Sequence, residues 1–184
     1  VIVGGLLSGL QQESDIVGYD LDGLTATFAK KDVGEGIPVS VIGDIQLVGE
    51  DAYKYILEQP DMTNLAADIA PADITSCAAF TDATDKNQSI YVGEGRFDAA
   101  DKFTGFNGEA VSGTTSYNMN GTAVDVSEIS AALKTLKDGE KLEITYTFRA
   151  SGNYTGEITD KITVTAQKRS SSSSGGGSAA LTYP

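Results

Sequence analysis

The sequence predicts an all-β protein made of two small β-sandwich domains in tandem, the second of which contains one short helix. Short β-prone runs separated by glycine dominate the first 70 residues. Several later runs alternate apolar and polar residues with the period of two that half-buried strands require. In a single stretch, the apolar residues are spaced as they are on one face of a helix. We therefore expect one β domain over residues 1–71, a second over 72–168, and a flexible linker over 169–184.

The first domain is predicted from runs of β-prone residues that glycines interrupt, where turns need tight backbone geometry. These runs cover residues 1–7, 23–29, 37–49 and 53–57. Alternation is clearest from Leu24 to Phe28 and from Val39 to Val41. Pro71, between two alanines, stops a strand and indicates the joint between the two domains.

The second domain is predicted to contain five strands, of which the last two form a hairpin. The strands are expected at Ile74–Phe80, Ser89–Val92, Thr114–Asn118, Lys141–Phe148 and Glu157–Ala166. Each strand of the hairpin alternates apolar and polar residues and so has one apolar face. The intervening residues 150–153, Ala-Ser-Gly-Asn, have turn chemistry.

One helix is predicted within this second domain. Its apolar stripe, at spacings of three and four, consists of Val126, Ile129, Leu133 and Leu136. Asp125 followed by Glu128 has the pattern of a capping box, and Gly139 follows as a stop signal. We expect the helix to pack across one end of the sandwich.

Composition narrows the classes of function. The 184-residue chain carries 13 basic and 26 acidic residues, a formal net charge of −13, which disfavours binding to nucleic acid and to anionic membrane surfaces. No apolar run approaches the roughly 20 residues of a membrane-spanning helix. The single cysteine, Cys77, cannot form an intramolecular disulfide and is expected to be a small buried hydrophobe.

Catalysis is not expected. The chain has no histidine, the usual general base and the partner of serine and cysteine nucleophiles. A hydrolase would have to use carboxylates alone, which we keep as the least favoured alternative. No cofactor is predicted.

Residues 22–41, 47–57 and 67–71 resemble the YDG-type repeats of bacterial surface proteins. The resemblance covers about the first 70 residues, with Lys54 where the family usually has asparagine. The leading strand of the repeat is absent upstream of Val1, so we expect a first domain that is truncated at its N-terminus and has an exposed sheet edge.

The closing hairpin of the second domain, residues 139–148, 152–156 and 161–165, resembles that of bacterial Ig-like repeats. The resemblance implies an Ig-like sandwich, and a β-grasp fold remains the alternative because strands flank the predicted helix. Both resemblances imply an extracellular stalk or spacer module of a bacterial cell-surface protein, linked to neighbouring domains of the same chain. An adhesin-type module that binds a glycan or a host protein is the alternative.

Two local features have alternative chemical interpretations. Asp20 and Asp22, followed by Gly23, resemble half of a calcium loop, but the twelfth position is Lys31 rather than a closing acid, so they form only a weak calcium candidate. A lysine–asparagine isopeptide bond needs a buried lysine, whereas Lys141 and Lys161 alternate with apolar neighbours and should point outward.

Overall fold

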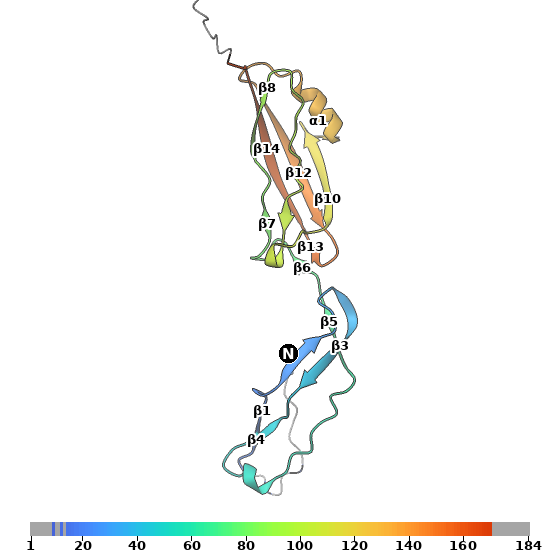
Figure 1. Ribbon diagram of the computed structural model, residues 1–184, viewed down its shortest axis with the longest axis vertical. Coiled ribbons are helices and arrows are strands. Elements are labelled where there is room, and N and C mark those ends of the chain that lie inside the picture. Colours follow the sequence, from blue (N-terminus) through green and yellow to red (C-terminus); the bar gives the residue numbers. More distant parts are fainter. Residues whose placement is uncertain (1–8, 10–11, 13, 171–184) are drawn as a thin grey trace, which may run out of the picture. The chain divides into compact units, whose positions relative to one another are not determined.

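The structure is a computed structural model that describes residues 9, 12 and 14–170. Its contacts divide the chain into two compact units, Val1–Ala70 (unit 1) and Pro71–Pro184 (unit 2), each described separately below (Figure 1). Strands dominate both units, and the described residues contain one short α-helix. The predicted all-β class with a single short helix is thus confirmed. The predicted linker lies outside the described residues except for Arg169 and Ser170.

Unit 1 contains two small antiparallel sheets. Its elements are β1 (Gly18–Asp20), β2 (Thr25–Phe28), β3 (Gly34–Ile42), β4 (Gln46–Val48), the 3₁₀ turn η1 (Ala52–Lys54) and β5 (Leu65–Ile69). β1 pairs with β4, while β3 lies between β2 and β5. The run predicted at residues 1–7 lies outside the described residues.

Two glycines fix the turns on either side of β4. Gly43 and Gly49 have φ values of 113° and 114°, a region that L-residues rarely adopt. A Cβ atom at Gly43 would overlap the carbonyl oxygen of Gly23, and one at Gly49 would overlap that of Ile16. These positions therefore need glycine for both its conformational freedom and its lack of a side chain.

The β2–β3–β5 sheet of unit 1 has one apolar face, because its pairing places alternate residues on the same side. Ile37 is the single hydrophobic side chain that is buried among the described residues of unit 1. On the same face, Phe28 and Leu65 are 42% and 38% exposed. The described residues of unit 1 therefore form a much smaller core than those of unit 2.

The β-prone run at residues 53–57 does not form a strand. The chain instead forms the η1 turn, in which the Lys54 and Tyr55 backbone N–H groups donate to Asp51 and Ala52. The Lys54 side chain is held by Asp51 at 2.6 Å and by Asp15 at 3.2 Å. Local ion pairs and a tight turn thus outweigh the β propensity of the two tyrosines.

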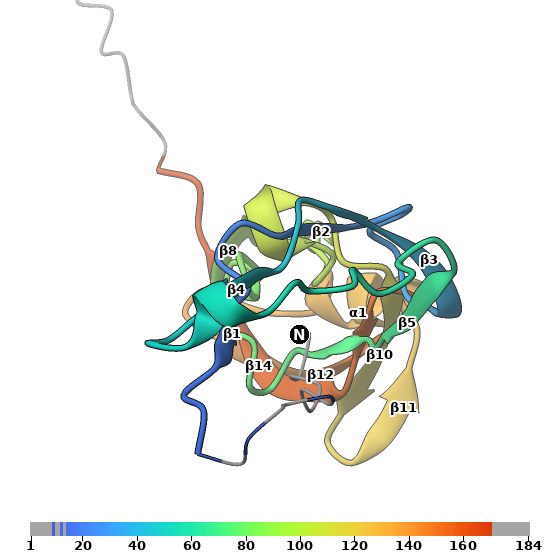
Figure 2. The same cartoon turned by 90° about the horizontal axis from the view of Figure 1, so that it is seen from below.

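Unit 2 is organised around a five-stranded mixed sheet. Its elements are β6 (Ala72–Asp73), β7 (Thr81–Asp82), β8 (Asn87–Tyr91), β9 (Phe103–Thr104), η2 (Phe106–Gly108), β10 (Gly113–Met119), β11 (Thr122–Val124), α1 (Val126–Leu133), β12 (Lys141–Ala150), β13 (Tyr154–Thr155) and β14 (Glu157–Gln167). The order across the sheet is β11-β10-β12-β14-β8. Figure 2 shows β10, β12 and β14 side by side as a curved layer.

The predicted hairpin is confirmed as the pair β12–β14, whose register runs from Lys141↔Thr165 to Arg149↔Glu157. One face of this pair forms the centre of the core. The buried residues there are Ile144, Tyr146, Phe148, Ile162, Val164 and Ala166. The opposite face carries mainly threonines and charged residues, as the alternation predicted.

The second layer of unit 2 consists of α1 and the segments that precede and follow β8 between β6 and β10. From this layer Ile74, Phe103, Val111, Ile129 and Leu133 join the core cluster. The rings of Phe103 and Phe148 stack with centroids 3.8 Å apart, which joins the two layers. Cys77 is half-buried against this cluster.

The helix is shorter than its apolar stripe predicted. The capping box is confirmed: the Asp125 carboxylate accepts from the Glu128 N–H, and the Glu128 carboxylate accepts from the Asp125 N–H. Ile129 and Leu133 are fully buried, but Val126 is 42% exposed, and the helix ends at Leu133. Leu136 packs on the core from the turn beyond the helix.

The strand predicted at Ile74–Phe80 is wrong. Only Ala72–Asp73 pairs as β6, and the chain then turns. The Asp73 carboxylate accepts hydrogen bonds from the backbone N–H and the hydroxyl of Thr75, which ends the strand. Local side-chain hydrogen bonding has overridden the apolar pattern here.

Candidate functional site

Four polar side chains of unit 2, those of Asp82, Lys86, Tyr146 and Asp160, form a bonded cluster. The Lys86 ammonium lies 2.5 Å from Asp82 Oδ2 and 3.0 Å from Asp160 Oδ2. It also donates to the Tyr146 hydroxyl, which in turn donates to Asp82. The ammonium lies 4.6 Å from the centre of the Tyr146 ring. We call these four residues the Lys86 cluster.

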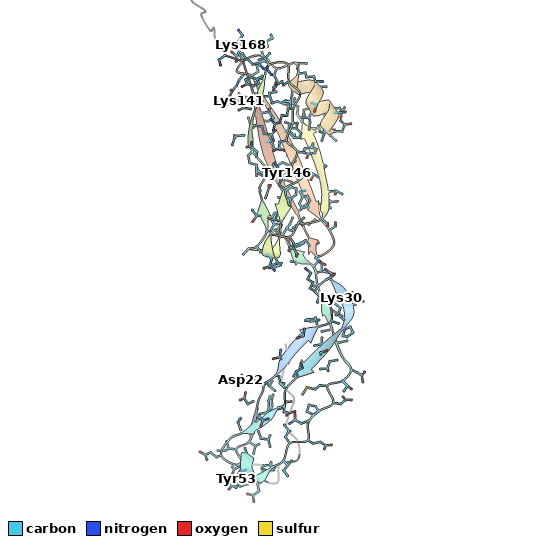
Figure 3. The ribbon with its side chains drawn as sticks, in the orientation of Figure 1. Asp22, Lys30, Tyr53, Lys141, Tyr146 and Lys168 are labelled. Atoms are coloured by element: carbon cyan, nitrogen blue, oxygen red, sulfur yellow. The ribbon has the colours of Figure 1, made fainter. Side chains whose placement is uncertain are left out.

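Each member of the Lys86 cluster comes from a different part of the fold. Asp82 ends β7, Lys86 directly precedes β8, Tyr146 lies in the middle of β12, and Asp160 lies on β14 (Figure 3, where Tyr146 is labelled). Tyr146 is fully buried, while the side chains of Asp82 and Lys86 are 14% and 30% exposed. The cluster therefore lies at the boundary between the core and solvent.

Electrostatics fixes the charge states in this cluster. Burial alone would raise the pKa of Asp82, but hydrogen bonds from Lys86, Thr84 and Tyr146 outweigh it and lower that pKa. Burial would likewise lower the pKa of Lys86, but its bonds to Asp82, Tyr146 and Asp160 raise it instead. Burial, with the nearby Asp82 charge, raises the pKa of Tyr146. At neutral pH the cluster thus contains an ammonium, carboxylates and a neutral phenol.

These charge states decide what chemistry the cluster supports. Amide formation between a lysine and a carboxyl group requires a neutral amine as nucleophile. Here the amine is held charged and the Asp82 carboxyl is held ionised, which disfavours that reaction. The arrangement instead favours a hydrogen-bonded ion pair that joins the segment before β8 to β12 and β14.

Sequence reasoning missed this cluster, because two of its members are more than 60 positions apart from Asp82 along the chain. The lysines singled out in the sequence lie elsewhere. Lys141 and Lys161 are both exposed, as predicted, and Lys161 reaches Glu143 at 3.3 Å. The available local signal was the spacing of Asp82 and Lys86, which are four residues apart.

The weak calcium candidate, Asp20 and Asp22, lies at the end of β1. The Asp20 carboxylate accepts a hydrogen bond of 2.9 Å from the Asp22 backbone N–H, and Leu24 N–H donates to Leu21 to close the turn. This is the geometry of an Asx turn. Within the described residues no group of three or more metal-ligating side chains comes together.

A small polar pocket lies beside β8. It has a volume of about 100 Å³ and is lined by Asp85, Gln88, Ser89, Ile90, Arg96 and Asp98. The buried Gln88 amide donates to the carbonyls of Asp85 and Asp98 and accepts from the Asp98 N–H. Pockets for drug-sized ligands measure roughly 300 Å³ or more, so this pocket is too small for such a ligand. The Gln88 hydrogen bonds instead fix the chain around Asp85 and Asp98 against β8.

Exposed large hydrophobic side chains are concentrated on unit 1. Those of Ile16, Phe28, Ile42, Val48, Tyr53, Ile56 and Leu65 are exposed there, compared with Tyr91, Val92, Phe106 and Val126 in unit 2. Tyr53 and Ile56 are the most extreme, at 82% and 99%. Figure 3 shows Tyr53 projecting outward from the η1 turn.

Comparison with known proteins gives one match. Residues 2–63 match the family model described as the YDG domain, which agrees with the resemblance found in the sequence and lies within unit 1. Neither the curated proteins nor the solved structures include a significant match. In the described part of the chain, no helix has the length and apolarity needed to cross a bilayer.

Proposed function

We propose that this chain is a non-catalytic stalk or spacer module of a bacterial cell-surface protein. It would act outside the cell and connect neighbouring domains of the same polypeptide. The observation that carries the proposal is the YDG match over residues 2–63, followed directly by a second compact β unit. Consecutive β units of this kind set the spacing between the domains that they join.

The hairpin formed by β12 and β14 supports an Ig-like assignment for unit 2. Its strands are long, antiparallel and apolar on one face, and a layer with its own short strands packs on that face. This is the organisation of a sandwich with one extensive sheet. The assignment is part of the proposal and agrees with the stalk function.

The spacer function is tested by exchange. In a surface-displayed chimera that carries a known binding domain at its tip, this chain is replaced by an unrelated two-domain β spacer of the same length. Capture of the tip domain's ligand by the cells should be unchanged, whereas deleting the chain should reduce it. If the exchange itself abolished capture of the ligand, the chain would be supplying a specific contact, and the spacer proposal would be wrong.

A second candidate is an adhesin-type module that binds a glycan or a host protein. The exposed hydrophobic side chains of unit 1 favour it, because they could supply a contiguous apolar patch, and such patches mark interaction sites. Thermal unfolding with a panel of cell-surface glycans and matrix proteins tests it, because a ligand that binds the native state raises its melting temperature. A rise that Tyr53→Ser or Ile56→Ser removes would support binding, and an unchanged melting temperature at saturating concentrations would reject it for that panel.

A further inference from the structure

Among the described residues of unit 2, β6 is the first strand and β14 the last. β6 pairs in parallel with β13, with Tyr154 opposite Ala72. β8 pairs in parallel with β14, from Thr163 opposite Asn87 to Gln167 opposite Tyr91. Because β13 and β14 are separated only by Gly156, one nearly continuous run is paired in parallel with both early strands. In Figure 1, β6 lies at one end of unit 2 and β14 ends at the other.

The first of these parallel contacts is short but closely fitted. The Ala72 N–H donates to the Asn153 carbonyl at 3.0 Å, and the Ile74 N–H donates to the Thr155 carbonyl at 2.9 Å. Gly156 has a φ of 92°, and a Cβ atom there would lie 2.5 Å from Asp73 Oδ1. Ile74 is buried in the core directly after β6.

The second parallel contact is longer and is reinforced at both ends. The Thr163 N–H donates to the Lys86 carbonyl at 2.9 Å, and the Val92 N–H donates to the Gln167 carbonyl at 3.0 Å. The Lys86 cluster then ties the residue before β8 to Asp160 on β14 and to Tyr146 on β12. Backbone and side-chain bonds therefore hold the same two segments together.

Tension along the chain acts on these contacts in a particular direction. It pulls the N-terminal end of β6 one way and the C-terminal end of β14 the other way. Because β6 and β8 run parallel to β13 and β14, this force shears β6 and β8 along β13–β14. The backbone hydrogen bonds between these strands then lie across the force and share the load. In an antiparallel pair pulled from one end, by contrast, the bonds break one after another.

We propose that unit 2 bears tension along the chain, with the two parallel contacts of β13–β14 as the elements that resist it. The parallel contacts predict a resistance that depends on the direction of pulling. This inference deepens the spacer function proposed above and rests on that function for its biological use. Its physical content is a property of unit 2 alone.

Single-molecule force spectroscopy on the full chain tests the proposal with two pairs of attachment points. Both proteins carry Cys77→Ala and the shared handle Lys168→Cys. The second handle is Ala70→Cys, which shears the parallel contacts, or Lys141→Cys, which peels β14 from β12. Lys141 and Lys168 lie at the same end of unit 2 (Figure 3), and all three handle positions are exposed.

At equal loading rates we expect the unfolding force of unit 2 through residues 70 and 168 to be at least about twice that through residues 141 and 168, since forced unfolding reports the barrier along the pulled direction. Equal forces, or a lower force through residues 70 and 168, would overturn the proposal. Urea unfolding without force should give the same midpoint for both proteins, which excludes a difference in fold. The exchange experiment above does not depend on unfolding force, so failure of either proposal can be recognised separately.

Discussion

Lys86 illustrates how a residue outside any regular element can organise several strands. Its ammonium is partly withdrawn from water, and two carboxylates and a phenol replace the lost hydration. Surface pairs such as Lys161 with Glu143, whose side chains are more than 60% exposed, remain hydrated and contribute little. The two lysines therefore make a matched comparison between a partly buried and an exposed ion pair.

Replacing Lys86 by methionine should lower the free energy of unfolding of unit 2 by about 2 kcal/mol, because it leaves Asp82 with an uncompensated, partly buried charge. Lys161→Met, which removes a charge from the exposed pair, should change it by less than about 0.5 kcal/mol. Urea unfolding measures both values. Equal losses in the two variants would show that the Lys86 cluster is not a stabilising group.

The Lys86 cluster also predicts a pH dependence. The pKa of Asp82 is lower in the native state than the value of about 3.9 expected in the unfolded chain. Its contribution to stability is therefore complete above that value and is lost as the pH falls through the native pKa. Urea unfolding from pH 6 to about pH 2.5 should show this loss as a slope of the unfolding free energy against pH, and Asp82→Asn should reduce that slope. An unchanged slope would place the acid sensitivity elsewhere.

In unit 1 the glycine turns make a further prediction at the residue scale. Gly43→Ala should destabilise unit 1 by about 2 kcal/mol or more, because the added Cβ meets a backbone carbonyl at an unfavourable φ. Gly36 has a φ of 58° and open space around it. Gly36→Ala should therefore lower the free energy of unfolding of unit 1 by only about 1 kcal/mol. Hydrogen exchange of β3 amides can measure both changes. The reverse order would contradict the steric explanation.

At the scale of elements, α1 shows that an apolar stripe in the sequence predicts a helix but not which of its residues are buried. Its four residues share one helical face in the sequence, but only Ile129 and Leu133 are fully buried. Leu133→Ala should therefore lower the free energy of unfolding by about 3 kcal/mol. Val126→Ala, at the exposed start of the same helix, should change it by less than about 0.5 kcal/mol. Denaturant unfolding distinguishes this pattern from a uniform effect along the stripe.

The elements that could be predicted from sequence are those whose signals are local. The β12–β14 hairpin alternates over many residues, and the Asp125 cap lies within one turn of its partner. The segments around Tyr53 and Thr75 have strand-like composition, but ion pairs or side-chain hydrogen bonds turn the chain there. The Lys86 cluster depends on strand pairing between distant segments, which no local pattern specifies.

At the scale of the whole molecule, the two units differ in how they are stabilised. Up to Ala70 the chain has twelve acidic and three basic residues, whereas the remainder has fourteen and ten. Unit 1 therefore has strong self-repulsion and, in its described residues, a small core, whereas unit 2 combines an extensive core with nearly balanced charge. The first unit should be the more sensitive of the two to salt, because salt screens that repulsion.

We therefore expect two unfolding transitions, with unit 1 melting at the lower temperature. Each unit has its own internal contacts, so each can unfold cooperatively. Calorimetry of the full chain should resolve both transitions. Gly43→Ala should shift the first and Leu133→Ala the second. A single transition that both substitutions shift would show that the units unfold as one.

The parallel pairing of β8 with β14 also matters for synthesis of the chain. β8 ends at Tyr91, but its partner begins at Glu157, so the ribosome must add the whole intervening segment before the two can meet. Until then the edge of β8 and the apolar residues that β14 later covers are open to other nascent chains. Of the described strands, β14 is thus the last to be made and the one that closes the sheet of unit 2, so a chain truncated before Glu157 would be prone to aggregation.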